Sequence, residues 1–328
     1  MILVTGGAGF IGSNIIAALD EAGMDVAVCD RLGTDDKWRN LAKRSLRAFI
    51  APESLPKYLE SERTNIDAVI HMGAISSTTA TDADFIIHNN FELSRTLWEW
   101  CAEHEVRFIY ASSAATYGEG GNGFSDNWVD AELKKLRPLN LYGWSKHLFD
   151  RYVARTVELG QPVPPQFAGL KFFNVYGPNE QHKGSMKSVV AELFPKVTNS
   201  EPARLFRSYH PDYGDGGQLR DFVYVRDCVD VVMWLFATPN VSGIFNVGSG
   251  QARSFADLAG ATMLAVGRTP EIEFIEMPEE LRNKYQYYTE ADISSLRNHG
   301  YNQAPTPLDE GITDYVTRYL MNTTDPHR

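Results

Sequence analysis

The glycine-rich fragment TGGAGFIG, at residues 5–12, constrains the fold of this chain more than any other feature. Its glycines, Gly6, Gly7, Gly9 and Gly12, follow an apolar run typical of a strand and precede a stretch with helical spacing. Glycines in this pattern allow a tight turn and a close backbone approach, so that a pyrophosphate can meet free N–H groups at a helix N-terminus. Because the fragment stands between a strand and a helix, it predicts a dinucleotide-binding loop rather than an ordinary glycine turn.

Short apolar runs rich in β-branched residues recur along the first half of the chain. They are ILVTG from Ile2, VAVCD ending at Asp30, IDAVIH ending at His71, RFIYASS ending at Ser113 and LKFFNVYG ending at Gly177. Residues 13–22 and 90–104, between these runs, have helical spacing and few breakers. Alternation of this kind predicts βαβ units and a parallel sheet covered on both faces. We therefore expect an α/β fold with a Rossmann-like, doubly wound parallel sheet.

The pattern becomes less regular after Gly177, where prolines separate shorter elements. Residues 208–218, SYHPDYGDGGQ, are rich in turn formers and predict a loop. We predict a dinucleotide-binding Rossmann domain over residues 1–177 and a smaller α/β, mainly substrate-binding lobe over residues 178–328. Residues of about 220–250 are expected to return to the Rossmann core.

The composition is that of a globular protein, because 43% of the 328 residues are hydrophobic and 12% aromatic, enough for a large core. A formal net charge of −11 gives no general attraction to nucleic acid or to an anionic membrane. The three cysteines lie far apart and outside any CxxC spacing, so neither a disulfide framework nor a zinc cluster is indicated. No secretion signal and no membrane-length apolar run is seen. We expect a soluble, cytoplasmic protein without metal, nucleic-acid or membrane partners.

Three charged residues follow the second predicted strand. Asp30 ends it about twenty residues after the glycine loop, where an acid can hydrogen-bond an adenosine ribose hydroxyl. Arg31 and Lys37 come next and could neutralise a 2′-phosphate, although such charges are also common on solvated loops. We predict NADP as the cofactor, with NAD as the alternative.

The motif YGWSK, at residues 142–146, is the only YxxxK among the fifteen tyrosines. On a helix, Tyr142 and Lys146 share a face. The ammonium can favour the phenolate, which lowers the tyrosine pKa, and can hold a nicotinamide ribose. Ser112 and Ser113 end an earlier strand, where a hydroxyl can donate to the reacting oxygen beside the tyrosine. Together with the glycine loop, these residues predict redox chemistry rather than a surface helical pair.

The motifs TGGAGFIG, ASSAATYG and YGWSK together resemble the extended short-chain dehydrogenase/reductase family, and the resemblance covers essentially the whole chain. It implies a Rossmann domain, a bound nicotinamide dinucleotide, a nucleotide-sugar substrate held by the C-terminal lobe, and a homo-oligomer. Further motifs resemble the epimerases that act on ADP-heptose. These are GAISSTT from Gly73, NN at residues 89–90, KFFNVYGPNEQHKGSM at residues 171–186, RDFVYV from Arg220 and KYQYYTEAD from Lys284.

This second resemblance implies inversion at C6 of the heptose, through a transient ketone and re-reduction by the same NADP, in lipopolysaccharide core synthesis. Inversion requires proton transfer on two faces of the sugar carbon. Tyr142, aided by Lys146 and Ser113, would serve one face, and Lys183 would serve the other unless it is only a contact residue. Implied cofactor residues are Gly6, Gly9, Phe10, Ile11, Gly12, Asp30, Arg31, Lys37, Met72, Gly73, Ala74, Ile75, Ser76, Asn89, Lys146, Val175 and Lys183. Implied substrate residues are Ser113, Asn174, Ser185, Phe206, Arg207, Ser208, Tyr209, Arg220 and Tyr285.

Some positions depart from this pattern. Pro52 stands near the expected second basic residue for the 2′-phosphate, Glu192 replaces a polar substrate contact, and the loop before Arg220 is longer than usual. A UDP-sugar 4-epimerase shares the glycine loop, serine, tyrosine and lysine and is the nearest rival. A 4,6-dehydratase is disfavoured because Ala114 and Ala115 stand where its acid pair is expected. A non-catalytic nucleotide-binding Rossmann protein is the alternative from another class.

Overall fold

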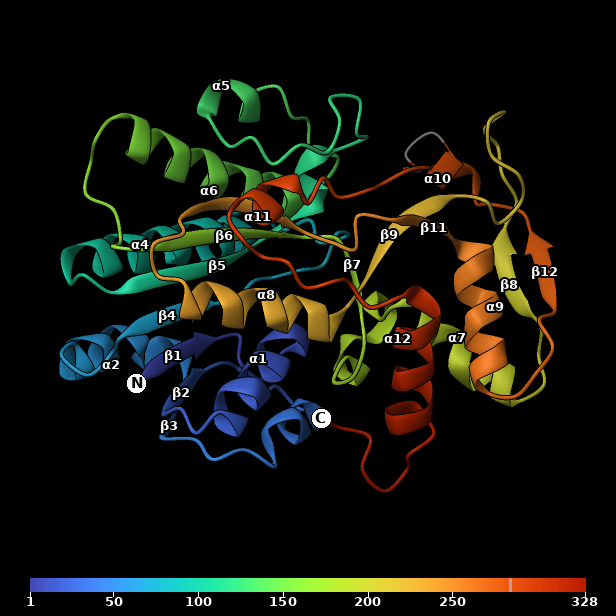
Figure 1. Cartoon of the computed structure of the whole chain (residues 1–328), viewed down its shortest axis with the longest axis horizontal. Coiled ribbons are helices and arrows are strands. Elements are labelled where there is room, and N and C mark those ends of the chain that lie inside the picture. The colour runs from blue at the N-terminus through green and yellow to red at the C-terminus, as the bar shows by residue number, and fades with distance from the viewer. Residues whose placement is uncertain (283–284) are drawn as a thin grey trace.

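The computed structural model describes residues 1–282 and 285–328, so that Lys284, the first residue of KYQYYTEAD, lies outside the described residues. Within these ranges, seven strands pair in parallel in the order β10-β6-β5-β4-β1-β2-β3 (Figure 1). The strands are β1 (Ile2–Thr5), β2 (Val26–Cys29), β3 (Ala48–Ile50), β4 (Ala68–His71), β5 (Arg107–Ser113), β6 (Phe167–Phe172) and β10 (Gly243–Val247). The predicted doubly wound α/β fold is confirmed, because the order reverses at β1 as in a Rossmann sheet.

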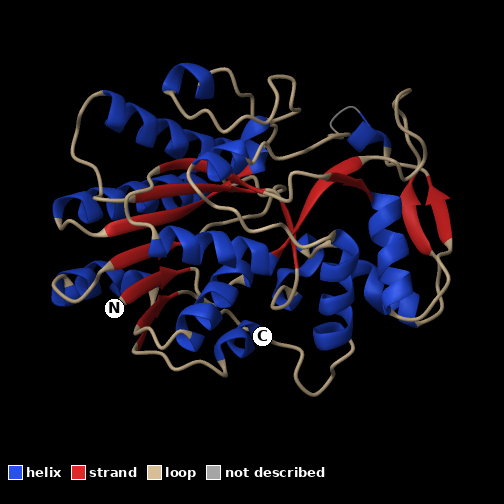
Figure 2. Cartoon of the chain, in the orientation of Figure 1, coloured by secondary structure: helices blue, strands red, loops and turns tan. Residues whose placement is uncertain are grey.

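Helices cover both faces of this sheet, and the helices of each face share one apolar core. One face carries α1 (Phe10–Glu21), α8 (Val225–Ala237) and α11 (Ser294–Asn298). The other carries α2 (Leu55–Glu62), α4 (Leu93–Glu103) and α6 (Leu141–Glu158). Figure 2 shows the strands enclosed between these two layers. Burial on both sides explains why the strands are almost uniformly apolar.

Three elements differ from the sequence-based prediction. The run LKFFNVYG is not one strand, because the chain leaves the large sheet after Phe172 and β7 (Asn174–Tyr176) pairs with β9 (Leu219–Tyr224) in another sheet. Strand β3 was missed because it is very short and its Phe49 is exposed at the sheet edge. The helix predicted over residues 90–104 begins earlier, as α3 (Ala83–Ile87) followed by a π turn at His88–Glu92.

The smaller unit, at the right of Figure 1, is built on two short sheets. Strands β7, β9 and β11 (Ala252–Ser254) form one, and β8 (Ala203–Phe206) pairs with β12 (Ile272–Ile275) in the other. A separate apolar core joins them to α7 (Val189–Thr198), α9 (Phe255–Ala265) and α12 (Leu308–Tyr315). The remaining short helices are α5 (Asp130–Leu133) and α10 (Glu279–Arg282). Because β10 pairs with β6, the chain returns from this unit to the large sheet.

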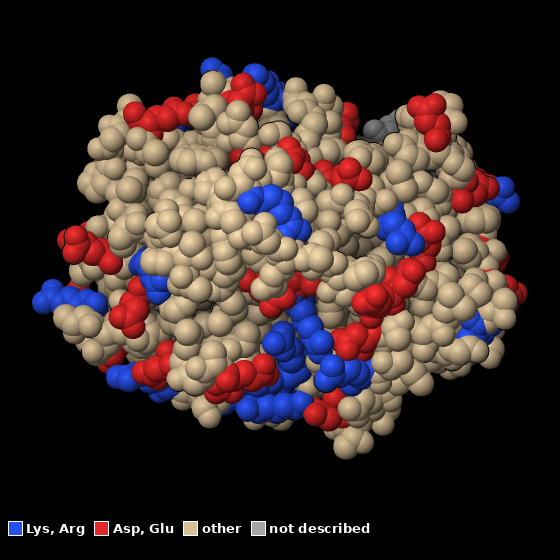
Figure 3. All heavy atoms as spheres, viewed as in Figure 1, with Lys and Arg blue, Asp and Glu red and all other residues tan. Residues whose placement is uncertain are grey.

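The surface carries charges of both signs. Figure 3 shows Asp and Glu interspersed with Lys and Arg on the viewed face, with basic side chains gathered near the position of the C-terminus in Figure 1. Across the described ranges, no helix combines the length and apolar character that crossing a membrane requires.

Candidate active site

A cavity of about 780 Å³ lies at the carboxyl edge of the large sheet. Its walls come from the segments that follow β1, β2, β4 and β5, from the first turns of α6, and from residues 172–175 and 182–186. In a doubly wound sheet, ligands bind outside the carboxyl ends of the strands where the strand order reverses. The cavity occupies that position, between β1 and β4.

The glycine loop forms one wall because larger residues would not fit there. Gly6 has φ +64°, and a Cβ on it would lie 2.5 Å from the backbone nitrogen of Gly73. A Cβ on Gly12 would lie 2.3 Å from the carbonyl oxygen of Gly6. Gly9 caps α1 without a side chain, so no cap side chain occupies the first N–H groups of this helix. These free N–H groups suit a phosphate.

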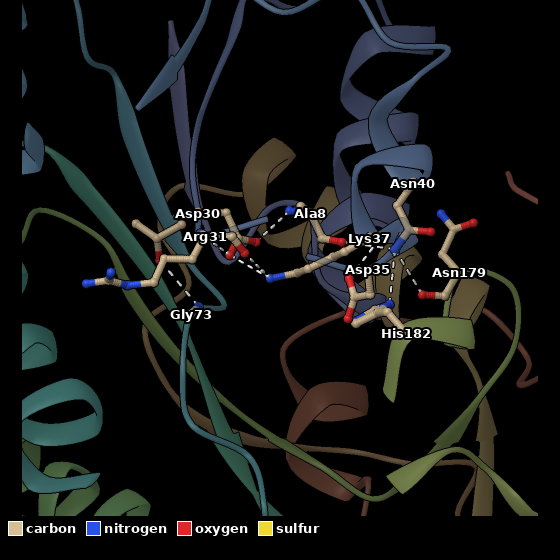
Figure 4. Close-up of polar contacts among 10 residues, drawn as sticks. Ala8, Asp30, Arg31, Asp35, Lys37, Asn40, Gly73, Asn179 and His182 are labelled. Carbon is tan, nitrogen blue, oxygen red and sulfur yellow. Dashed lines mark hydrogen bonds and ion pairs between the residues drawn. The ribbon is translucent and has the colours of Figure 1, made fainter. Parts of the chain in front are cut away.

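Asp30 and Lys37 form the next part of the wall. Figure 4 shows the Asp30 carboxylate between the glycine loop and the Lys37 ammonium. One oxygen accepts from the Ala8 amide at 2.8 Å, and the other accepts from Lys37 Nζ and from the Arg31 amide, each at 2.7 Å. The Arg31 guanidinium is exposed and pairs with Glu53, so that only Lys37 of the two predicted cations reaches the cavity.

The YGWSK motif lies on the first turns of α6. Asn140 caps this helix by accepting a hydrogen bond from the Gly143 amide at 2.8 Å. Gly143 lets the helix approach the end of β5, because a Cβ there would lie 2.6 Å from the Ala115 carbonyl oxygen. Tyr142 and Lys146 both line the cavity beside Ser113. The helix therefore delivers all three predicted groups to one place.

Burial is the main cause of the pKa shifts of Lys146 and Tyr142. It lowers the pKa of Lys146 to about 8, against the opposing effect of Asp150. It raises the pKa of Tyr142, and the hydrogen bond with Ser113 only partly offsets this while Asp150 adds to it. The net direction for Tyr142 is opposite to the one expected from the sequence, because the desolvation of a phenolate outweighs the stabilising contacts.

Lys183 enters the same cavity from a different element, the 3-10 segment Gln181–Met186. Its ammonium lies 5.1 Å from the centre of the Phe10 ring, at the start of α1. Burial lowers the Lys183 pKa, and the nearby Glu180 opposes this shift. Glu180 is fixed by the Ser188 hydroxyl, which donates to it at 2.6 Å. Lys183 and Tyr142 thus line the same cavity, although they come from separate parts of the chain.

The structure brings many of the predicted cofactor, catalytic and substrate residues together in one cavity and leaves others outside it. The cavity is lined by Gly6, Gly9, Phe10, Ile11, Gly12, Asp30, Lys37, Met72, Gly73, Ala74, Ile75, Ser76, Ser113, Tyr142, Lys146, Asn174, Val175 and Lys183. It is not lined by Arg31, Asn89, Ser185, Phe206, Arg207, Ser208, Tyr209, Arg220 or Tyr285. Asn89 is half-buried and donates to the Phe85 carbonyl. Its buried neighbour Asn90 instead bonds both backbone groups of Ile75 and donates to Ser145 on α6.

Several predicted substrate residues form a second cluster in the smaller unit. The buried Arg220 guanidinium lies 5.4 Å from the Tyr285 ring and 5.6 Å from the Phe255 ring. Phe206 packs against Tyr285 at 6.4 Å. The adjacent Gln286 lines the cavity and donates to the Gly118 carbonyl at 2.7 Å. The segment after Tyr285 therefore connects this cluster to the cavity.

Sequence reasoning missed part of the cavity wall. The additional lining residues include Ser77, Thr78, Leu139, Asn140, Phe173, His182, Met186, Gln286 and Thr289. Ser77 and Thr78 stand in the GAISSTT motif, and His182 stands beside Lys183 in HKGSM. The position of Ser77, Thr78 and His182 within these motifs could have indicated that they line the cavity.

Comparison with known proteins agrees with this geometry. The sequence profile of the NAD dependent epimerase/dehydratase family matches residues 2–248. The chain belongs to this family. An ADP-L-glycero-D-manno-heptose-6-epimerase of Nitratidesulfovibrio vulgaris is 50% identical over 100% of both chains. The enzyme of that name from Fusobacterium nucleatum is 47% identical over 98% of both.

Two solved structures of the epimerase/dehydratase fold are similar over nearly the whole chain. The Helicobacter pylori ADP-L-glycero-D-manno-heptose-6-epimerase matches with a TM-score of 0.76 at 29% identity, covering 97% of this chain and 95% of that one. The Thermus thermophilus UDP-glucose 4-epimerase, in complex with NAD, matches with a TM-score of 0.75 at 28% identity, covering 96% and 97%.

The cavity of this NAD dependent epimerase/dehydratase family member fits a nicotinamide dinucleotide. Its glycine loop leaves room for a backbone-bound phosphate, and the Asp30 carboxylate stands where a ribose hydroxyl would bind. Lys146 is buried and lines the cavity, and among the described residues its ammonium has no hydrogen-bond partner. A buried cation in that condition calls for a polar ligand.

Proposed function

We propose that this protein is an ADP-L-glycero-D-manno-heptose 6-epimerase that uses a bound nicotinamide dinucleotide. The observation that carries the proposal is the convergence of Tyr142, from α6, and Lys183, from residues 181–186, on the cavity formed by the glycine loop. Inversion needs proton transfer on both faces of one carbon, and two such groups supply it. The similarity to relatives of that name supports the choice of sugar.

A dinucleotide in this cavity supplies reversible hydride acceptance. Tyr142 takes the proton of the sugar hydroxyl as the C–H bond is broken, and Ser113 donates a hydrogen bond to the same oxygen. Lys146 binds the ribose hydroxyls and stabilises the phenolate. After the sugar end has turned, Lys183 gives a proton to the carbonyl oxygen as hydride returns to the opposite face. The hydride that leaves C6 returns to it, so no net oxidation occurs, and Tyr142 and Lys183 regain their starting protonation by exchange with solvent.

We propose NADP as the dinucleotide, with NAD as the alternative. Lys37 supports NADP because its ammonium lies at the cavity wall, 2.7 Å from Asp30, where the adenosine ribose of a Rossmann ligand lies. Arg31 lends less support because it pairs with Glu53.

We assign substrate binding mainly to the part of residues 178–328 that forms the smaller unit, apart from α8, β10 and α11, which pack with the large sheet. A guanidinium can hold a diphosphate with two parallel hydrogen bonds, which suits Arg220 to the ADP group. Tyr285 lies beside Arg220, Phe206 packs against Tyr285, and Asn174 lines the cavity. On the family resemblance we also assign Arg207, Ser208, Tyr209 and Ser185 to substrate binding. A cytoplasmic homo-oligomer acting in lipopolysaccharide core synthesis completes the proposal, on the strength of the family resemblance.

Turnover of two nucleotide sugars tests the function. Purified protein should invert C6 of ADP-D-glycero-D-manno-heptose and leave UDP-glucose unchanged, with product configuration followed by NMR. Activity on UDP-glucose alone would favour the 4-epimerase reading. A protein that holds no dinucleotide and turns over neither sugar would favour a non-catalytic role.

The role of Lys183 gives a separate prediction. Lys183→Met should lower kcat about a hundredfold, because one of the two proton-transfer groups is lost. Steady-state kinetics on ADP-heptose measure the effect, and KM should change little. Lys187→Met is the matched control, since Lys187 directly follows this segment and does not line the cavity. If Lys183→Met instead weakens binding and keeps kcat, Lys183 is only a contact residue.

A further inference from the structure

His182 is a cavity-lining side chain that the proposed reaction does not use. It stands on the segment Gln181–Met186, next to Lys183. Figure 4 shows it grouped with Asn40 and Asn179 at one end of a polar cluster that continues through Lys37 to Asp30. It therefore belongs to the part of the cavity where the adenosine ribose is expected.

Asn40 fixes the orientation of this imidazole. Its side chain is buried, and its amide nitrogen donates to the Ala8 carbonyl at 2.9 Å and to the Asn179 carbonyl at 3.2 Å. Its amide oxygen accepts from Nδ1 of His327 at 2.9 Å. Two carbonyl partners require a donor, so the amide cannot be turned around. Asn40 thereby ties the glycine loop to the segment that leads to His182.

The fixed amide decides the tautomer of His182. Nδ1 of His182 lies 3.3 Å from the Asn40 amide nitrogen, whose two hydrogens are engaged by the two carbonyls. That nitrogen cannot accept a hydrogen bond, so a proton on Nδ1 would have no acceptor there and Nδ1 is the unprotonated ring nitrogen. Burial, together with the charge of Lys37, lowers the His182 pKa to about 4, so the ring is neutral near pH 7. Its proton is then on Nε2. Among the described residues, Nε2 has no hydrogen-bond partner.

We propose that His182 is a further dinucleotide-contact residue, whose Nε2–H donates to an oxygen on the adenosine ribose or its 2′ substituent, and that Asn40 positions it. The inference rests on the proposed function, which requires a bound dinucleotide. An uncharged N–H donor can serve a hydroxyl or a phosphate, so it adds affinity for NADPH and NADH alike. Lys37 then supplies the charge that distinguishes them.

This contact has a consequence for Lys183. The two residues are adjacent on one short segment, so a dinucleotide that engages His182 also holds the backbone from which Lys183 extends. Binding at the adenosine end and placement of the second proton-transfer group are therefore coupled.

Direct binding tests the proposal. His182→Phe keeps a ring of similar size and removes the N–H donor, and His182→Ala removes both. In protein freed of nucleotide, the Kd for NADPH, followed by its fluorescence, should rise about fivefold to tenfold in each variant, the loss of one hydrogen bond. His299→Phe is the control, since His299 is exposed, bonds the Ser295 carbonyl of its own helix and does not line the cavity, and the Kd of this variant for NADPH should match that of the wild type.

The outcomes separate the two proposals. Wild-type affinity in both His182 variants would overturn the contact while leaving the epimerase proposal intact. A wild-type protein that binds neither NADPH nor NADH would refute the proposed function itself.

Discussion

Tyr142→Phe should lower epimerisation by about a thousandfold or more while leaving the dinucleotide bound. The substitution removes the hydroxyl that exchanges a proton with the sugar and changes little volume, and general acid–base groups contribute about 10²–10⁴-fold. Lys146 and the glycine loop, which we assign to dinucleotide binding, are unchanged. Single-turnover kinetics on ADP-heptose measure the loss, and cofactor absorbance reports the bound dinucleotide.

Tyr176→Phe is the matched control for this experiment. Tyr176 is also buried, and its hydroxyl donates only to the Leu308 carbonyl at 3.4 Å, outside the cavity. It should retain full activity. Wild-type turnover by Tyr142→Phe would remove Tyr142 from the reaction.

Lys171→Met should destabilise the fold by about 3–5 kcal/mol, because it leaves a buried charge without its partner. Lys171 and Asp150 are fully buried, and Lys171 Nζ donates to Asp150 and to Thr116, each at 2.7 Å. Ser112 also donates to Asp150 at 2.7 Å, so the pair joins the end of β5 to α6, directly behind Ser113 and Tyr142. Chemical denaturation with guanidinium measures the change in unfolding free energy.

The double variant Asp150→Asn with Lys171→Met separates charge from packing. It removes both buried charges and keeps the side-chain volumes similar. Because no charge then has to be desolvated, it should recover much of the unfolding free energy that the single variant loses. If the single variant is as stable as the wild type, the ion pair does not hold these elements together.

The fold could be predicted from the sequence where local pattern and tertiary structure agree. The apolar run before the glycine loop and the runs ending at Asp30, His71 and Ser113 each correspond to a strand of the large sheet. The change of sheet between β6 and β7 could not be predicted from the sequence pattern. Both strands are extended and mostly apolar, and they differ only in the strands with which they pair.

Site residues could be predicted from the sequence where they stand at strand ends or in motifs. Contacts between segments that are distant in the sequence could not. Tyr142, Lys146 and Lys183 stand in motifs and line the cavity. The contact between Asn40 and His182 joins positions far apart in the sequence, and no spacing rule indicates it. The pKa of Tyr142 also depends on burial, which a motif does not show.

The return of β10 to the large sheet makes this sheet depend on residues from both halves of the chain. Strand β6 is buried along its whole length between β5 and β10. A fragment cut at Gly177 would lack β10, and β6 would become an apolar edge with unsatisfied backbone groups, a template for aggregation. The nucleotide-binding half therefore cannot be excised as an independent module, and any engineered exchange of sugar specificity has to graft segments into an intact chain.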